Sequence, residues 1–417
     1  MPEYEIDINN LQIINSCSEF YNEIIENLEK SESAYIITLY LGTKEYSKNI
    51  FKALKKRKER NLKTKIFVDK NRIDEENSKR YLYKYYNEKS HDGYTNKEKT
   101  IYELLEEYEI ASMIQYVDLK NYYFLPKILR ELFYVLHSKI YVFDNRVFLT
   151  GANLDDSYFV NRVDRYYKVE SNELSAYLCF EYFKVNQTFY IREESKKNIK
   201  SNKKYGLTYK LSVYHSEIEM LKYLILENSF KEYYLSTAYI NFPEEYIQLF
   251  KNINLKVIVP DSRNNTFFNE NSTIERIIVD LYSIYLHDTI DILKNRNGSI
   301  FDYYIGNHKK SKAEKKSAVK FYKYYKKNNT FHYKGFWAFK KDCAATIIGS
   351  TNFNRRSYSR DKESNFLLFT KDKKMIKVLR AEVDKLFKNT KEIKNNTLDI
   401  NHKISKRILA MFLKSFM

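Results

Sequence analysis

The chain has 417 residues, a formal net charge of +18 and 43% hydrophobic residues. This length allows two domains or one large two-lobed domain, and the apolar share excludes a disordered chain. The positive charge favours an anionic partner: nucleic acid, an acidic membrane surface or a phosphorylated substrate. The abundance of Lys, Asn, Ile and Tyr also fits an AT-rich coding sequence, so the charge alone does not choose among these partners.

The cysteines and the apolar runs exclude further classes of protein. Cys17, Cys179 and Cys343 are widely separated, which argues against a disulfide framework and a structural zinc site and favours reduced thiols in an intracellular compartment. No apolar run reaches the roughly eighteen residues needed to span a bilayer. Residues 1–30 are acidic and contain no Arg, which argues against a secretory signal and a conventional transit peptide.

The first half alternates between predicted strands and helices. In chain order, the pattern predicts a strand at 34–42, a basic helix at 45–60, a strand at 65–69, strands near 138–143 and 146–150, and a helix at 173–190. Such alternation is typical of a mixed or parallel sheet covered by helices on both faces.

The second half begins again in the same order, after a segment rich in Lys, Asn and Ser. Its predicted elements are a helix at 216–229, a strand at 233–241, a helix at 243–252 and a strand at 255–260. We therefore expect an N-terminal lobe at 1–191, a linker or surface loop at 192–206, a C-terminal lobe at 207–400 and a basic amphipathic helix at 401–417.

A constant spacing relates the two halves. Three pairs of similar residues are each 199 positions apart: Thr38 and Thr237, Asn153 and Asn352, and Asp164 and Glu363. His137 and His332 are 195 apart, because the second motif has four extra residues between its His and its Asn. An offset that recurs at three places favours an internal duplication over chance similarity in a biased composition.

Each half carries a His-x-Lys motif beside an apolar strand. His137 and Lys139 project from the same side of an extended chain, and so do His332 and Lys334. Two imidazoles suit phosphoryl transfer without a metal, in which one attacks phosphorus and the other protonates the leaving group and then activates the acceptor. The two lysines would stabilise the charge that builds on the non-bridging oxygens. No metal and no cofactor are expected.

Polar residues follow the next strand in both halves. Asn153 comes after a Gly-containing turn, and Ser350 and Asn352 follow a strand and a Gly, so all three are predicted to bind substrate. Asp164 and Glu363 are candidates for carboxylates that stand behind the imidazoles and fix their tautomers. Surface salt bridges are the alternative for these two acids.

A cluster of arginines lies just after the second motif. Arg355 and Arg356, with Arg360, are candidates for binding an acceptor phosphate through paired hydrogen bonds. The alternative is that they are ordinary surface arginines, or that one of them pairs with Asp361 within the chain.

These residues resemble the phospholipase D superfamily, whose motif is H-x-K-x4-D followed by Gly-Ser elements; His137, Lys139 and Asp144 match it. The stretches HSKIYVFDNRVFLTGANLDDSYFVNRVDRYY (137–167) and IIGSTNFNRRSYSRDKESN (347–365) are similar to the phosphatidylglycerophosphate synthases of the phospholipase D type. The resemblance implies an α/β fold of two tandem phospholipase D-like lobes. Each lobe would be a mixed sheet flanked by helices, and a pseudo-twofold axis would relate them around one shared active site.

The resemblance also implies roles for the motif residues. His137 would be the nucleophile and His332 the acid and base, with Lys139, Asp144 and Lys334 completing the catalytic set. Two departures from the superfamily pattern make the halves unequal: Thr150 and Gly151 stand where Gly-Ser is usual, and Phe339 stands where the second Asp would fall. Both departures favour the synthases over a generic phosphodiesterase.

The reaction implied converts CDP-diacylglycerol and sn-glycerol 3-phosphate into phosphatidylglycerophosphate and CMP through a phosphohistidine. The product leads to phosphatidylglycerol and cardiolipin. The resemblance further implies a mitochondrial, membrane-associated protein that binds an anionic membrane surface peripherally, with no nucleic acid as partner. Residues 402–417 are expected to form a helix that lies in the membrane interface or, alternatively, packs on the core.

Two other functions remain open from the residues alone. A nuclease or other nucleic-acid phosphodiesterase on the same scaffold would suit the basic charge and the 16% of aromatic residues. A lipid-binding protein without activity is disfavoured because both His-Lys-Asn sets are intact.

Overall fold

The computed structural model describes residues 3–73, 99–118, 135–184, 208–214, 216–228, 230–267, 273–294, 318–394 and 404–414. The chain divides into two compact units. The N-terminal unit comprises Tyr4–Asn161 and Arg165–Tyr209, and the C-terminal unit comprises Met1–Glu3, Arg162–Asp164 and Lys210–Met417. The predicted linker at 192–206 lies outside the described residues.

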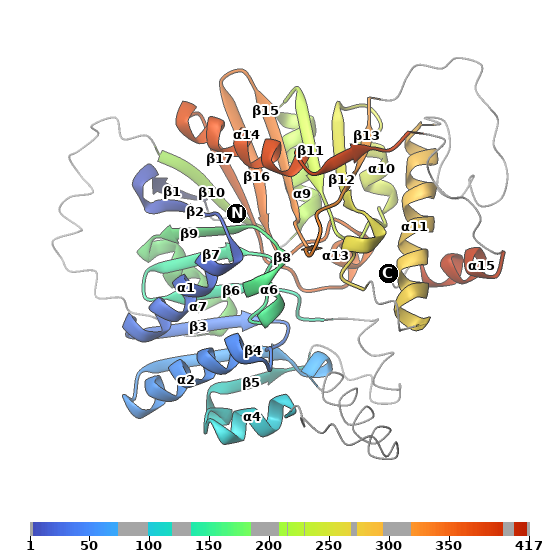
Figure 1. Cartoon of the computed structure of the whole chain (residues 1–417). Helices are drawn as coiled ribbons and strands as arrows, with labels where there is room; N and C mark the ends of the chain where they lie inside the picture. The colour runs from blue at the N-terminus through green and yellow to red at the C-terminus, as the bar shows by residue number, and fades with distance from the viewer. Residues whose placement is uncertain are drawn as a thin grey trace, which may run out of the picture. The chain divides into compact units, whose positions relative to one another are not determined.

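A seven-stranded mixed sheet forms the centre of the N-terminal unit (Figure 1). In sheet order, its strands are β2 (Leu11–Ile14), β9 (Tyr166–Glu170), β7 (Arg146–Thr150), β6 (Ile140–Phe143), β3 (Ser33–Thr38), β4 (Lys63–Asp69) and β5 (Ile114–Val117). The neighbours β3, β4 and β5 are parallel, and the other pairs are antiparallel. The mixed sheet predicted from the sequence is confirmed.

Helices cover both faces of this sheet because alternate strand residues are apolar on both sides. The helices are α1 (Cys17–Lys30), α2 (Glu45–Glu59), α4 (Ile101–Glu107), α6 (Asp156–Val160) and α7 (Asn172–Phe183). Ile36 and Tyr141 belong to the core cluster formed with α1 and α2. On the opposite face, the Phe183 ring of α7 lies 5.4 Å from the ring of Tyr35.

The predicted elements of this half are present, and their limits differ from the predicted ones by a few residues in most cases. The strand expected at 34–42 ends at Thr38, because the Thr38 hydroxyl donates to the carbonyl of Tyr40 and accepts from the backbone N–H of Leu154. The basic helix expected at 45–60 is α2. Its Arg57 is buried and donates to the backbone carbonyls of Leu28 and Ser31, so this basic residue serves the core.

The sheet of the C-terminal unit repeats the same strand order (Figure 1). Its consecutive strands are β10 (Thr208–Tyr214), β17 (Asn365–Thr370), β16 (Cys343–Gly349), β15 (Gly335–Lys340), β11 (Glu232–Ser236), β12 (Leu255–Pro260), β13 (Lys320–Tyr324) and β18 (Thr390–Glu392). Here β11, β12 and β13 are parallel and the other pairs are antiparallel. Seven strands thus match the other sheet in order and direction, which agrees with the predicted internal repeat.

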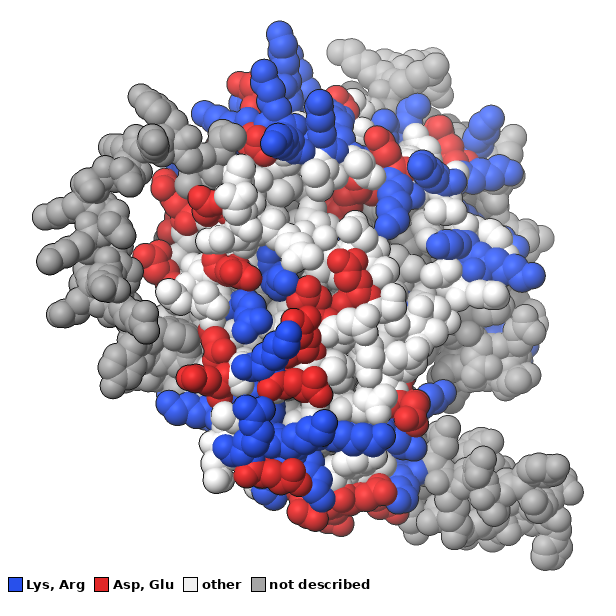
Figure 2. Space-filling view, turned by 60° about the vertical axis from the view of Figure 1, so that its left-hand side comes forward, with Lys and Arg blue, Asp and Glu red and all other residues white. Residues whose placement is uncertain are grey.

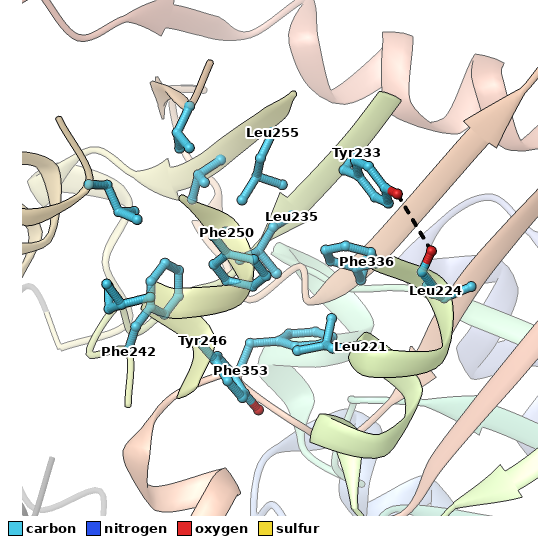
Figure 3. Packing of buried hydrophobic residues seen from close by; sticks show 14 of the residues in the cluster. Leu221, Leu224, Tyr233, Leu235, Phe242, Tyr246, Phe250, Leu255, Phe336 and Phe353 are labelled. Atoms are coloured by element: carbon cyan, nitrogen blue, oxygen red, sulfur yellow. Dashed lines mark hydrogen bonds between the residues drawn. The ribbon is translucent and has the colours of Figure 1, made fainter. Parts of the chain in front are cut away.

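The helices of the C-terminal unit include the predicted ones and three that the sequence pattern missed. They are α9 (Glu217–Lys222), continued by a π-helical turn (Tyr223–Glu227), α10 (Glu244–Phe250), α11 (Thr273–Lys294), α13 (Arg355–Ser359), α14 (Lys373–Phe387) and α15 (Ile404–Leu413). The missed helices are α11, α13 and α14. Figure 3 shows how Leu221 of α9 and Phe250 of α10 pack with Phe336 of β15 and with Phe353 in the core of this unit.

Short elements complete the chain. They are β1 (Glu3–Asp7), the pair formed by β8 (Arg162–Val163) and β14 (Thr330–Phe331), and 3-10 turns at Ile8–Asn10, Ala111–Met113 and Ser262–Asn264. None of the helices in the described ranges is long and apolar enough to cross a membrane. The three cysteines are free, as predicted. On the face drawn in Figure 2, basic and acidic side chains are interspersed, so the net charge is not gathered into one patch there.

Candidate active site

A two-residue parallel strand pair brings Asp164 to His332. In this pair Arg162 lies opposite Thr330, and Val163 lies opposite Phe331. The next residues, Asp164 and His332, therefore leave the pair side by side. The backbone N–H of His332 donates to the carbonyl of Val163 at 3.0 Å, and His332 Nδ1 lies 2.7 Å from Asp164 Oδ2. Both side chains are buried, so this contact is shielded from water.

Lys334 completes a buried triad with these two residues. Its Nζ lies 2.7 Å from His332 Nδ1 and 3.4 Å from Asp164 Oδ2, and it donates to the His332 carbonyl at 3.2 Å. Burial lowers the pKa of Lys334, while the carboxylates of Asp164 and Glu363 oppose that shift. Since a carboxylate can only accept, a proton on Nδ1 is the one that Asp164 binds, which places the imidazole lone pair on Nε2, 3.2 Å from Lys334 Nζ.

Glu363 lies just before β17, beside the segment that follows β16 and contains Ser350. It accepts hydrogen bonds from the hydroxyls of Ser350 and Ser357, the latter at 2.7 Å. Gly349 has φ of +151°, and a Cβ there would lie 2.2 Å from the Ser364 carbonyl oxygen, so glycine is required at this turn. Ser350, which was predicted to bind substrate, thus donates a hydrogen bond to Glu363 and fixes this carboxylate in place.

Asn352 has a fixed backbone and an available side-chain oxygen. Its N–H donates to Ser357 Oγ at 2.9 Å, and its carbonyl accepts from Thr237 Oγ1 at 2.6 Å. Asn352 Oδ1 is buried, and no hydrogen-bond partner lies within reach of it among the described residues. A buried amide oxygen of this kind is suited to a hydroxyl or protonated group of a ligand, which supports the substrate contact predicted for Asn352.

The two predicted arginines differ in their surroundings. Arg356 Nη2 pairs with Asp361 Oδ1 at 3.0 Å. Burial disfavours its charged form, but the Asp361 carboxylate outweighs burial and raises the pKa of Arg356. The alternative of an intramolecular pair therefore describes Arg356. The backbone N–H of Arg355 donates to the carbonyl of Asn241 at 2.9 Å, which anchors the start of α13.

The first motif is held by the backbone of the N-terminal unit. Asp69, at the end of β4, accepts from the backbone N–H of Leu136 at 2.7 Å and so positions the residue before His137. Lys139 Nζ donates to the His137 carbonyl at 2.6 Å, and both side chains are buried. Lys139 and Lys334 thus bind the carbonyl of the histidine two residues earlier in the same manner.

Asn153 is bound within the protein. Its Oδ1 accepts from the Thr38 hydroxyl at 3.3 Å and from the backbone N–H of Leu39 at 3.2 Å, and its Nδ2 donates to the Tyr158 hydroxyl at 3.2 Å. These contacts join the end of β3 to the turn after β7. They support a structural role for Asn153 and not the substrate contact predicted for it.

Asp144, which the sequence analysis assigned to the catalytic set, is bound to the backbone at the start of β3. It lies in the turn after β6, whereas His137 and Lys139 precede β6, and the four residues of that strand span about 13 Å. Its carboxylate accepts from the backbone N–H of Ser33 at 2.8 Å and from that of Glu32 at 3.1 Å. At the equivalent place in the second motif, Phe339 is fully buried in β15. These contacts support a role for Asp144 in holding the turn to β3.

Sequence reasoning missed two polar residues near the second motif. Tyr239 follows β11, and its ring lies 6.1 Å from the His332 ring, edge to face. Glu217 of α9 is buried and accepts from the Tyr246 hydroxyl at 2.7 Å. Burial raises the pKa of Glu217 to about 7, with Glu363 adding to the shift. Glu217 lies on the same face of α9 as the apolar Leu221. A charged residue on an otherwise apolar helix face was the sequence signal that could have identified Glu217.

In the parts of the chain that the structure describes, no three His, Cys, Asp or Glu side chains are grouped so that they could hold a metal ion.

The fold and these motifs define a class: an α/β protein with two similar mixed sheets, whose motifs are similar to those of the phospholipase D type. Residues 24–184 match the family model described as "Cardiolipin synthase, PLD-like domain". Phosphatidylserine synthase from Haemophilus influenzae shares the fold with a TM-score of 0.71 at 18% identity, over 100% of this chain and 97% of that one. Polyphosphate kinase from Porphyromonas gingivalis has a TM-score of 0.51 at 9% identity, over 99% and 52% of the two chains.

Within this class, the chain is similar to CDP-diacylglycerol–glycerol-3-phosphate 3-phosphatidyltransferases, so the resemblance seen in the sequence is confirmed. A probable enzyme of that name from Dictyostelium discoideum is 22% identical, over 99% of this chain and 78% of the relative. The Saccharomyces cerevisiae enzyme is 26% identical over 64% of this chain, and the mitochondrial Bos taurus enzyme is 22% identical over 66% of it. The chain spans 62% and 59% of the length of these two relatives.

Proposed function

We propose that this chain is a phosphatidyltransferase that makes phosphatidylglycerophosphate and CMP from CDP-diacylglycerol and sn-glycerol 3-phosphate. One observation carries the proposal: the buried triad of Asp164, His332 and Lys334, in a chain similar over 99% of its length to a relative named for this reaction. The triad supplies a histidine with a defined tautomer, and the relatives' names supply the substrates.

The first step is attack of His137 on the phosphatidyl phosphorus. A nitrogen–phosphorus bond forms, and the phosphorus–oxygen bond to CMP breaks. His332 begins this step as an imidazolium that the carboxylate of Asp164 stabilises. It donates the proton from Nε2 to the departing oxygen of CMP and becomes neutral. Lys139 and Lys334 balance the charge on the non-bridging oxygens.

The second step reverses these roles. His332, now neutral, takes the proton from the C1 hydroxyl of glycerol 3-phosphate. The hydroxyl oxygen bonds to phosphorus, the nitrogen–phosphorus bond breaks, and His137 is regenerated. Asn352 Oδ1, which is buried and without a described partner, is placed to accept from a hydroxyl of a substrate.

The lipid substrate also implies a place of action. We place the protein peripherally on an anionic membrane surface, which suits its net charge of +18. The names of several relatives include the word mitochondrial, and we extend that location to this chain as part of the proposal.

The deciding experiment measures CMP release from CDP-diacylglycerol with four acceptors: glycerol 3-phosphate, serine, glycerol and water. We expect release only with glycerol 3-phosphate, and phosphatidylglycerophosphate as the lipid product. A preference for serine would reassign the acceptor. Cleavage of single-stranded DNA without CMP release would replace the proposal with the nuclease alternative.

A further inference from the structure

The outward side of α15 is apolar. Four residues of this ten-residue helix are exposed: Ile408 by 50%, Leu409 by 38%, Met411 by 50% and Phe412 by 75%. At 100° per residue, Ile408, Met411 and Phe412 cluster on one side of the helix. A surface helix of a globular protein normally turns polar residues toward water, so this helix has the opposite arrangement.

The inward side of α15 is held against α11 by the contacts below. These contacts prevent α15 from rotating about its axis, so the same residues stay exposed. Ala410 is buried in a cluster with Leu281 and Tyr285 of α11, and the Tyr285 hydroxyl donates to the Ala410 carbonyl at 2.9 Å. Lys406 pairs with Asp280 of α11. Figure 1 shows α15 lying beside α11 in the same unit. The polar contacts of α15 therefore face the protein, and its apolar residues face outward.

The end of α15 is joined to the loop after β11. Asn241 Nδ2 donates to the carbonyl of Lys414 at 2.6 Å, and the Asn241 carbonyl accepts from the backbone N–H of Arg355 at 2.9 Å. The same loop begins at Thr237, whose hydroxyl binds the Asn352 carbonyl. Two hydrogen bonds of Asn241 thus connect the end of α15 to the start of α13. Helix α15 belongs to the C-terminal unit, which also contains His332.

The size of the apolar side decides between two occupants. A ten-residue helix is about 15 Å long and about 10 Å wide, so one side of it offers a few hundred Å² at most. A stable contact with a second protein needs roughly 800 Å² from each partner. Insertion of a few side chains into a bilayer has no such minimum area, and Arg407, which flanks the apolar side at 100° per residue, supplies positive charge there.

We propose that Ile408, Met411 and Phe412 of α15 insert into the interface of an anionic phospholipid bilayer and dock the C-terminal unit on the membrane. The purpose of this docking, access to a lipid substrate, rests on the proposed function. The docking itself is measurable without catalysis.

The test is sedimentation with vesicles of phosphatidylcholine containing phosphatidylglycerol, and with phosphatidylcholine alone. Phe412→Gln removes the most exposed ring without changing the charge. Val378→Gln is the matched control, since Val378 is 43% exposed on α14. We expect Phe412→Gln to weaken vesicle binding by about tenfold and Val378→Gln to bind as the unchanged chain does. The double variant Ile408→Gln/Met411→Gln should show a comparable loss.

Equal vesicle binding by Phe412→Gln and the unchanged chain would overturn the proposal. So would a dimer in light scattering that Phe412→Gln converts to a monomer with vesicle binding preserved. Circular dichroism and thermal melting show whether each variant is folded. Vesicle binding with no CMP release would refute the proposed reaction alone, whereas CMP release from detergent-dispersed lipid with no vesicle binding would refute the docking alone.

Discussion

The carboxylate of Asp164 lies 2.7 Å from Nδ1 of His332, although 168 positions separate the two residues in the chain. The hydrogen bond from the backbone N–H of His332 to the carbonyl of Val163 holds Asp164 and His332 in register. A carboxylate at Nδ1 keeps the imidazole in one orientation and stabilises its protonated form. In the proposed reaction it therefore acts on both proton transfers of His332.

Asp164→Asn should lower kcat by roughly 10²- to 10⁴-fold, because the amide neither fixes the tautomer nor balances the imidazolium. KM for CDP-diacylglycerol should change much less. Steady-state kinetics of Asp164→Asn, His332→Ala and the double variant form a cycle. The double variant should be no slower than His332→Ala. Full additivity of the two losses would contradict a shared role.

His137→Ala should abolish exchange of labelled CMP into CDP-diacylglycerol without acceptor, since no phosphohistidine can form. His332→Ala retains the proposed nucleophile, so with CDP-diacylglycerol labelled in its phosphatidyl part, denaturation at alkaline pH should trap some labelled protein from that variant. Labelled protein from His137→Ala would mean that the nucleophile is His332 instead.

The sequence was sufficient for the mixed sheets and for the helices α2, α7, α9 and α10, because buried strands and amphipathic helices have strong periodicities, but it missed α11, α13 and α14. It was not sufficient for the partner of each side chain. Asp164 approaches His332 through strands of two residues each, which leave no periodic signal. Asn153 looked equivalent to Asn352 in the sequence. In the structure, Thr38 and Tyr158 bind the side-chain amide of Asn153, whereas Asn352 Oδ1 has no partner among the described residues.

Asp144→Ala should destabilise the fold by about 1–3 kcal/mol, because the backbone N–H groups of Ser33 and Glu32 lose their acceptor. Asp144 also has φ of +52°, a conformation that Asn tolerates and Ala does not. Asp144→Asn should therefore cost less than Asp144→Ala in urea unfolding. A loss of kcat in a fully folded Asp144→Asn variant would restore the catalytic role.

Glu217 should make stability depend on pH. Burial raises its pKa from 4.5 to about 7, so the folded state binds the proton more tightly than the unfolded state. The free energy of unfolding should consequently fall as pH rises from about 4.5 to about 7, by on the order of 3 kcal/mol. Glu217→Gln should remove this slope in urea unfolding between pH 5 and pH 8. The exposed Glu219→Gln, on the same helix, controls for the loss of one charge, and an unaltered slope in Glu217→Gln would exclude Glu217 as its source.

The parallel pair of β8 and β14 has a consequence for how this gene can evolve. Three residues from the first repeat, Arg162–Asp164, belong to the compact unit of the second. A break or a recombination event between the repeats would part His332 from the acid that orients it. Neither repeat can then be exchanged, lost or inherited alone without harm to the other, so selection acts on the two as one piece.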